Sequence, residues 1–280
     1  METPRLRRIL LLEKWRKFTT ILSLYPNRLP RLILDKRSVS RFRHTDGVQL
    51  MCSLGPLFVD NVHARSQLRE ILISGAYASR GFIPTSGWNV VDVGANLGFF
   101  SLWAASFMRR GSIVSIEAVP ETYQLLVRNA DIINRRGIRS QCLNLAVADT
   151  NRMLEFAIPD GYANYARATE HLGRLEGVAG ISRRTIQGQA LDEILAGLSD
   201  TGNSEESIDL LKIDVEGSEV DCIIGAADTL RRTKRVVLEY HSHDLLQESS
   251  LRLRNAGFKR MAIHPHFLGG GVGIVFWRAQ

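Results

Sequence analysis

Residues 89–101, with the sequence NVVDVGANLGFFS, decide the fold of this chain. The first five residues are apolar apart from an asparagine and one acid, which is typical of a short buried strand. The segment GANLG predicts a tight turn, because glycine adopts backbone conformations that other residues avoid. The apolar run FFSLWAASF at residues 99–107 then predicts a helix. A strand, a glycine turn and a helix in this order form the first unit of a nucleotide-binding α/β fold.

The turn does not follow the dinucleotide pattern G-x-G-x-x-G, because Asn96 and Phe99 occupy the second and third glycine positions. An acid, Asp92, stands two residues before Gly94. A carboxylate there repels a diphosphate and suits a cationic ligand, such as the amino-acid end of a sulfonium cofactor. The pattern D-x-G-x-N-x-G resembles motif I of the S-adenosylmethionine-dependent methyltransferases. The alternative is a strand–turn–helix unit that binds nothing.

The composition allows one sizeable core with a short appendage. The chain has 280 residues, of which 45% are hydrophobic and 23% charged. No apolar run is long enough to cross a bilayer. The three cysteines, Cys52, Cys142 and Cys222, are far apart and lack metal-ligand spacing. We therefore expect a reducing, cytoplasmic compartment.

Positive charge is concentrated at the N-terminus. Residues 1–45 contain 12 Lys and Arg against three acids, a balance of +9, whereas the other 235 residues contain 24 Lys and Arg against 26 acids, a balance of −2. Apolar residues recur at helical spacing within residues 5–22. We predict a basic helical arm at residues 1–45 before a domain at residues 46–280. The arm would either lie peripherally on the inner face of a membrane or pack as an ordinary helix on the domain.

Strands and helices alternate along the rest of the chain. We predict strands at residues 48–51, 57–59, 89–93, 112–116, 142–147, 153–158, 208–213, 235–238, 259–263 and 273–277. We predict helices at residues 62–74, 99–107, 120–134, 191–198, 218–231 and 245–255. An insertion or mobile loop is expected at about residues 160–190. This order predicts an α/β fold with a Rossmann-like, doubly wound sheet, mostly parallel with a C-terminal antiparallel hairpin.

Acidic residues follow the predicted strands at their carboxyl ends. They are Asp92, Glu117, Asp149, Asp214 and Glu239. In a doubly wound sheet, ligands bind beyond these ends, where the strand order reverses. Unrelated surface charges would not be expected to gather at one end of the sheet, so these acids predict a binding site there.

The site is expected to hold a nucleoside. Glu117 lies 23 residues beyond Gly94, where an acid can accept both ribose hydroxyls, although a helix N-terminus also favours an acid. Ala146 and Val147 would contact an adenine ring, and Asp149 would accept a hydrogen bond from its amine. The predicted cofactor-binding residues are Asp92, Gly94, Ala95, Asn96, Gly98, Phe99, Glu117, Ala118, Ala146, Val147 and Asp214. Tyr77 lies in the approach to the first core strand, where it could lean over a cofactor, but packing is the role we expect.

The segment LLKIDVEGSEVDCIIGA, at residues 210–226, carries a resemblance to a family. Together with VVDVGANLGFFS and IEAVPETYQLLVRNA, it closely resembles the FkbM-type methyltransferases, of which K-I-D-V-E-G-S-E is the most specific signature. The resemblance covers residues 88–260. It implies a Rossmann-like, S-adenosylmethionine-dependent methyltransferase that acts on oxygen in glycans, lipid-linked sugars or secondary metabolites. It does not identify the acceptor, because residues 1–60 and 160–190 lie outside it.

Methyl transfer to a hydroxyl needs an acceptor oxygen in line with the methyl group and a group that takes its proton. The candidates are Asp214, Glu216, Glu239 and His241, of which His241 alone is expected to titrate near neutral pH. Each also has a structural alternative, such as capping of the next helix by Glu216. A divalent metal held by Asp214, Glu239 and His241 is compatible with these oxygen-rich residues, but no spacing demands it, and no metal site is assigned.

Three hypotheses for the function follow. The first is an S-adenosylmethionine-dependent O-methyltransferase acting on a hydroxylated small molecule or glycan. The second, prompted by the basic arm, is nucleic-acid methylation. It is disfavoured because the fourth core strand ends in DVEG, without the D/N-P-P-Y platform for a flipped base, and because RNA 2′-hydroxyl methylation would need different catalytic residues, with a lysine at the site. The third is a non-catalytic cofactor-binding or membrane-surface partner protein, which the intact acids Asp92, Asp214 and Glu239 argue against.

Overall fold

A computed structural model describes residues 48–52, 55–59, 64–73, 75–159, 166–171, 180–198, 207–265 and 271–280. The predicted basic arm at residues 1–45 lies outside these described residues, as do parts of the predicted insertion. Within the described parts of the chain, no helix combines the length and the apolar character that crossing a membrane requires.

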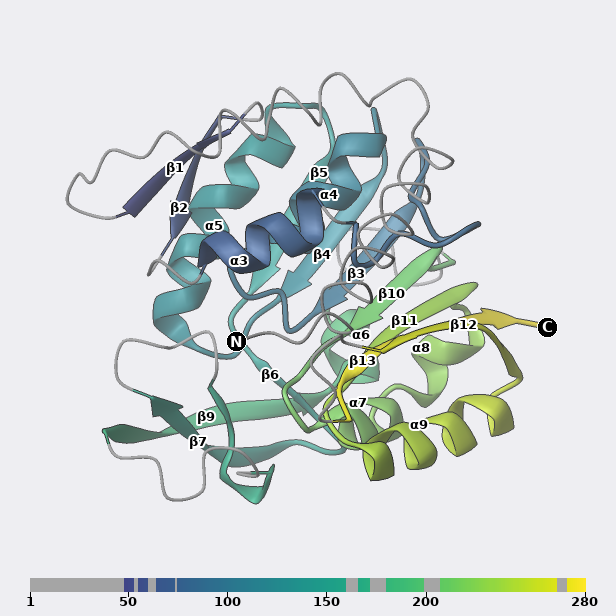
Figure 1. Cartoon of the computed structure of the whole chain (residues 1–280). Helices are drawn as coiled ribbons and strands as arrows, with labels where there is room; N and C mark the ends of the chain where they lie inside the picture. The colour runs from purple at the N-terminus through teal and green to yellow at the C-terminus, as the bar shows by residue number, and fades with distance from the viewer. Residues whose placement is uncertain are drawn as a thin grey trace, which may run out of the picture.

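A seven-stranded sheet forms the centre of the molecule (Figure 1). Its order is β12-β13-β11-β10-β3-β4-β5. The strands are β3 (Asn89–Val93), β4 (Ser112–Ile116), β5 (Arg139–Leu143), β10 (Leu210–Ile213), β11 (Arg235–Tyr240), β12 (Phe258–Pro265) and β13 (Gly273–Ala279). Five of them are parallel, and β13 runs antiparallel to both β11 and β12. The doubly wound, mainly parallel sheet with a C-terminal hairpin is therefore confirmed.

The order of the strands reverses between β3 and β10, which is where a sheet of this kind binds ligands. The chain adds β4 and β5 on one side of β3, and β10 and β11 on the other. Asp92 is paired with Lys212, and Val93 with Ile213. The two strands thus end level with each other, and the residues that follow them start from the same place.

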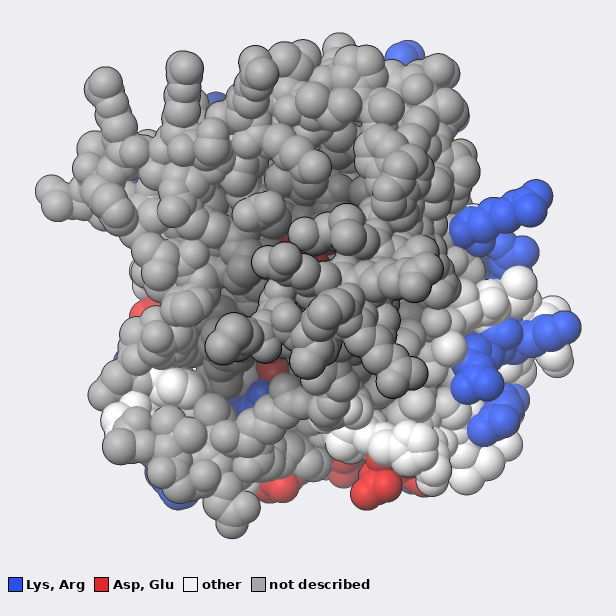
Figure 2. Space-filling model, viewed as in Figure 1, with Lys and Arg blue, Asp and Glu red and all other residues white. Residues whose placement is uncertain are grey.

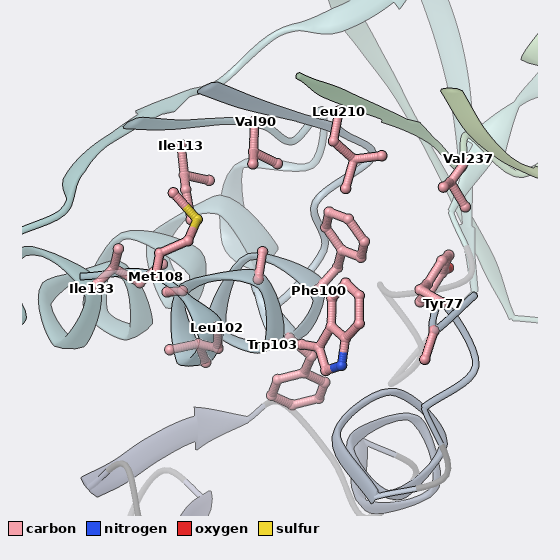
Figure 3. Packing of buried hydrophobic residues seen from close by; sticks show 14 of the residues in the cluster. Tyr77, Val90, Phe100, Leu102, Trp103, Met108, Ile113, Ile133, Leu210 and Val237 are labelled. Carbon is pink, nitrogen blue, oxygen red and sulfur yellow. The ribbon is translucent and has the colours of Figure 1, made fainter. Parts of the chain in front are cut away.

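Alternate residues of the central strands point to opposite faces, and helices cover both. Val90 and Leu210 pack with α4 (Phe99–Phe107) and α5 (Pro120–Asn134). Figure 3 shows this layer, with Phe100 and Trp103 of α4 on the same side of the sheet as Val90 and Leu210. The other face packs against α6 (Leu191–Ala196), α7 (Glu219–Ile224), α8 (Ala227–Arg231) and α9 (His243–Asn255).

A β-hairpin and a short helix precede the first core strand. The hairpin consists of β1 (Val48–Cys52) and β2 (Gly55–Val59), and the helix α3 (Ala64–Leu68) continues as a π-helical turn over Arg69–Ile73. Asn129 of α5 anchors the hairpin, because its amide bonds the backbone N and O of Phe58 at 2.7 and 2.9 Å. The same amide donates to the Leu97 carbonyl at 2.8 Å. Asn129 therefore ties the hairpin to the glycine turn.

A second, four-stranded sheet of order β6-β9-β7-β8 corrects two predictions. Its strands are β6 (Ala146–Ala148), β7 (Arg152–Pro159), β8 (Arg167–Ala168) and β9 (Ile181–Ala190). The single strand predicted at residues 142–147 is wrong, because β5 ends at Leu143 and β6 belongs to this other sheet. The segment predicted as an insertion contains β9, in which half of the residues are exposed and most are polar, so its pairing with β7 is hidden in the sequence.

The helix predicted over residues 218–231 is also divided. It forms α7 and α8, which are separated by Gly225 and Ala226. A Cβ atom on Gly225 would lie 2.1 Å from the Ala148 carbonyl oxygen. The glycine therefore lets the end of α7 touch β6, and the helix breaks at this contact.

The surface carries charges of both signs (Figure 2). In this view, Lys and Arg side chains project mainly at the edge that carries the C-terminal strands, while acidic side chains gather along the lower edge, near α7 and α9. Lys259 and Arg260 of β12 and Asp244 of α9 are exposed. This mixture matches the nearly neutral balance of residues 46–280.

Candidate functional site

A cavity of about 520 Å³ lies at the carboxyl ends of β3, β4, β10 and β11. This volume is typical of sites for small ligands. Its wall contains twelve of the residues predicted from the sequence: Gly94, Ala95, Asn96, Phe99, Glu117, Ala118, Ala146, Val147, Asp214, Glu216, Glu239 and His241. The structure thus brings all four predicted catalytic residues together with most of the predicted cofactor-binding residues.

The glycine turn after β3 forms one side of the cavity. Gly94 has a φ of 69°, and a Cβ atom on it would lie 1.7 Å from the Asp214 carbonyl oxygen, so no other residue allows this approach of the turn to β10. Asn96 also has a positive φ, of 52°. Its Oδ1 atom is buried and has no hydrogen-bond partner among the described residues. The turn therefore contains a buried acceptor atom whose hydrogen-bonding capacity is not used by the described residues.

Glu117 closes the same side at the end of β4. Its carboxylate accepts hydrogen bonds from the backbone N of Asn96 and of Val119, both at 2.9 Å. Burial raises the pKa of Glu117, and these two amides oppose the increase. Each carboxylate oxygen has a second lone pair, so Glu117 can still accept hydrogen bonds from a ligand. Asn144 supports the segment by donating to the carbonyls of Glu117 and Ala118 at 2.9 and 3.0 Å.

Asp92 lies beneath the cavity and not in its wall, which corrects its predicted contact with the cofactor. Its side chain is fully buried, accepts a hydrogen bond from Ser101 of α4 at 2.7 Å, and lies 3.1 Å from Lys212 Nζ. Lys212 also donates to the Gly94 carbonyl at 2.6 Å and lies 3.4 Å from Asp214 Oδ2. Burial alone would lower the pKa of Lys212, but Asp92 and Asp214 raise it overall. Asp92 therefore keeps Lys212 protonated and holds its ammonium group between the carboxyl ends of β3 and β10.

Tyr77 joins two carboxylates in the cavity. Its hydroxyl lies 2.6 Å from Glu239 Oε2 and 3.2 Å from Asp214 Oδ2. The ring packs edge-on to Phe100, with centroids 5.1 Å apart, and Figure 3 shows both side chains in the same core layer. Burial and the nearby Glu239 raise the pKa of Asp214 to about 7, although Lys212 acts against this. The predicted packing role of Tyr77 is present, but its hydroxyl also links the acids at the ends of β10 and β11.

His241, after β11, is held from behind by Glu219 of α7. Its Nδ1 lies 2.8 Å from Glu219 Oε1, and its Nε2 lies 3.4 Å from Glu216 Oε2 and 3.9 Å from Asp214 Oδ1. Burial lowers the pKa of His241, but Glu219 and the other two carboxylates raise it to about 10. This raised pKa departs from the titration near neutral pH that the sequence suggested for His241. The sequence suggested Asp214, Glu239 and His241 as a set of metal ligands. The structure instead places Glu216 beside Asp214 and His241, and Glu239 accepts a hydrogen bond from Tyr77.

Comparison with known protein families matches residues 92–260 to the methyltransferase FkbM domain. The chain belongs to the FkbM methyltransferase family. It is 31% identical over 223 residues to the 31-O-demethyl-FK506 methyltransferase FkbM of Streptomyces tacrolimicus. The alignment covers 72% of this chain and 84% of that protein.

Two further comparisons differ in how much of each chain they cover. The chain is 28% identical over 200 residues to the AMB antimetabolite synthetase AmbE of Pseudomonas aeruginosa, covering 62% of this chain but only 9% of the length of AmbE. The crystal structure of the methyltransferase FkbM from Methylobacillus flagellatus KT aligns with a TM-score of 0.46 at 12% identity, covering 92% of this chain and 60% of that chain.

The segment KIDVEGSE, residues 212–219, connects β10 to α7. It begins in β10 with Lys212, turns through Glu216 and Gly217, whose φ angles are 51° and 115°, and ends at the start of α7 with Glu219. Lys212 secures the strand ends, the acids of the turn face the cavity, and Glu219 orients His241. The signature thus builds one side of the site.

Sequence reasoning did not assign Lys212 or Arg167. Lys212 lines the cavity, so the site does contain a lysine. The absence of a lysine therefore cannot be used to disfavour methylation of an RNA 2′-hydroxyl. Arg167 comes from β8, in the predicted insertion, and its Nη2 lies 2.5 Å from Glu216 Oε2. The lysine within the signature was the available signal for Lys212. No sequence pattern indicated that Arg167 would reach the cavity.

Gly98 and Asp149 do not line the cavity, contrary to the sequence argument. Gly98 has a φ of 81°, and a Cβ atom on it would lie 2.8 Å from Leu126 Cδ1 of α5, so this glycine allows α4 and α5 to pack closely. Asp149 forms an ion pair with Arg152 at 3.0 Å and follows β6 of the small sheet. Its predicted contact with adenine depended on the strand that the structure divides.

Proposed function

We propose that this FkbM-family protein transfers a methyl group from S-adenosylmethionine to a hydroxyl oxygen of a small molecule, sugar or glycan. The observation that carries the proposal is one cavity with two chemically different ends. One end presents Glu117, Asn96 and small apolar side chains, and the other presents Asp214 and Glu239 joined through Tyr77.

The first end fits the cofactor. S-adenosylmethionine, when bound, supplies an electrophilic methyl group on a positively charged sulfur. Glu117 would accept hydrogen bonds from the ribose hydroxyls, and Ala146 and Val147 would pack on the adenine ring. The buried Asn96 Oδ1 has no hydrogen-bond partner among the described residues, and a donor group of the cofactor would satisfy it. Carboxylates around the cavity favour a ligand with positive charge.

The second end fits the removal of a proton from an alcohol. The Tyr77 hydroxyl has one proton and donates it over the shorter distance, to Glu239. It can then bond Asp214 only when Asp214 carries a proton, so the two acids and Tyr77 hold protons as one unit. The raised pKa of Asp214 suits a general base that works near neutral pH. We assign this trio to accept the proton of the acceptor hydroxyl.

The related protein from S. tacrolimicus supports oxygen as the acceptor atom, because its name gives a 31-O-demethyl compound as the substrate. Arg167 of β8 lines the cavity, so the small sheet forms part of its wall. We assign contacts with the acceptor to this sheet. The identity of the acceptor would then depend on side chains outside the glycine turn.

Methyl transfer to a panel of alcohols, sugars and amines tests this proposal. The protein would be incubated with S-adenosylmethionine carrying a deuterated methyl group, and products would be located by mass spectrometry and NMR. We expect an O-methyl product, and we expect Glu239→Gln to lower its rate by about 10²–10⁴-fold. Glu248→Gln, on α9 and ion-paired with Arg252 away from the cavity, is the matched control and should not change the rate. Transfer only to nitrogen, or equal rates for both variants, would contradict the assignment.

A further inference from the structure

Three potential metal ligands converge at the mouth of β10 and β11. The ligand atoms of Asp214, Glu216 and His241 all lie within 4.8 Å of one another. His241 Nε2 is 3.4 Å from Glu216 Oε2 and 3.9 Å from Asp214 Oδ1. Neighbouring ligands around an ion at 2.0–2.2 Å are about 3.0–3.6 Å apart. His241 Nε2 is therefore within a few tenths of an ångström of this spacing from each carboxylate oxygen, and the two oxygens themselves are at most 4.8 Å apart.

The orientation of His241 is that of a metal ligand. A histidine that binds a metal usually donates its other ring nitrogen to a carboxylate, which fixes the tautomer and the ring. Here the Nδ1 of His241 bonds Glu219, whose side chain is fully buried and also accepts from the backbone N of Gly217 at 2.9 Å. The His241 side chain is 10% exposed and turns Nε2 toward the cavity. Glu219 thus holds the imidazole in place for a ligand on the other side.

The charges around His241 leave room for a divalent cation. Two cations contact this group of carboxylates, namely Lys212 and Arg167. Four carboxylates are linked to them or to His241, namely Asp92, Asp214, Glu216 and Glu219. The carboxylates outnumber the cations even when His241 is protonated, as its raised pKa requires at neutral pH, and Glu239 beside Tyr77 is left out of the count. Because buried negative charge is costly without compensation, the group favours a further cation, which would replace the proton on the imidazole.

We propose that Asp214, Glu216 and His241 bind a divalent cation. One imidazole with two carboxylates favours ions such as Mn²⁺ or Zn²⁺ over Ca²⁺, which prefers oxygen ligands alone. Arg167 contacts Glu216 Oε2 without excluding the ion, because each carboxylate oxygen has two lone pairs. An ion at this point would make the proton of a bound alcohol easier to remove, next to Tyr77 and Glu239. This role rests on the proposed methyl transfer, whereas the ion site itself does not.

Binding of Mn²⁺ by the full chain tests the site. The protein would be dialysed against a chelator, freed of it, and titrated with MnCl₂ while electron paramagnetic resonance records the free ion. We expect one saturable site, weakened at least tenfold in His241→Gln and in Glu216→Gln. Glu219→Gln should weaken it by about 10–100-fold, because it removes the support of the imidazole. The matched control is His243→Gln, on the exposed first turn of α9, which should bind as the wild type does.

Circular dichroism of each variant separates loss of the site from loss of the fold, and two independent ligand variants keep the test decisive if one unfolds. No saturable binding by the wild type, or equal binding by His241→Gln and His243→Gln, would overturn the ion site. Calorimetry with S-adenosylhomocysteine on the same samples distinguishes the two proposals. If the wild type binds S-adenosylhomocysteine but not Mn²⁺, only the proposed ion site is refuted. If the wild type does not bind S-adenosylhomocysteine, the proposed function is refuted.

Discussion

Replacement of Gly94 by alanine is expected to lower the free energy of unfolding by about 2–5 kcal/mol. Two physical terms contribute. The φ of 69° belongs to the left-handed region, which costs an L-residue about 1–2 kcal/mol. The added Cβ would also lie 1.7 Å from the Asp214 carbonyl oxygen and 2.8 Å from its carbon, and overpacking of this kind costs about 1–3 kcal/mol. Backbone atoms cannot rotate away, so β3 and β10 must separate.

Gly257 offers a matched control for this substitution. Its φ is 88°, but a Cβ atom there would meet nothing within 4 Å. Gly257→Ala should therefore lose only the conformational term of about 1–2 kcal/mol. Urea unfolding followed by tryptophan fluorescence measures both variants under the same conditions. Equal losses for the two variants would refute the argument that Gly94 is required by the contact with Asp214.

Two other substitutions test the supports of the site. Asn129→Ala leaves three backbone groups without their side-chain partner, and we expect a loss of about 2–4 kcal/mol in thermal unfolding; a loss below 0.5 kcal/mol would show that the hairpin does not depend on this amide. Lys212→Met leaves Asp92 and Asp214 without their shared cation, and we expect a loss of about 3–5 kcal/mol in urea unfolding, whereas unchanged stability would show that the buried charges are compensated elsewhere.

The central sheet was predictable because local signals agree with the fold. Residues 89–107 combine a buried apolar strand, glycines where the backbone needs them, and an apolar helix, and the structure has β3 and α4 at these positions. The strand β9 was missed for the opposite reason. Half of its residues are exposed and two, Arg183 and Arg184, are charged, so its existence depends on pairing with β7, which is not visible in its own sequence.

The position of the site was predictable from the sequence, but the contacts between its side chains were not. Acids after successive parallel strands must meet at one edge, and Asp214 and Glu239 do so. The role of Asp92 depended on the register that sets it against Lys212, and register between distant strands cannot be read from either segment. Tyr77 and Arg167 reach the cavity from outside the parallel sheet, so neither strand-end position nor periodicity could identify them.

Isothermal titration with S-adenosylmethionine and S-adenosylhomocysteine tests the central claim most directly. We predict that the wild type binds both with a dissociation constant in the micromolar range, about −8 kcal/mol. Asn96→Gly keeps the positive φ but removes the buried Oδ1, and it should bind both ligands about tenfold more weakly, as expected for one lost hydrogen bond. No heat of binding from the well-folded wild type would contradict the account, because the cavity would then not be a site for this cofactor.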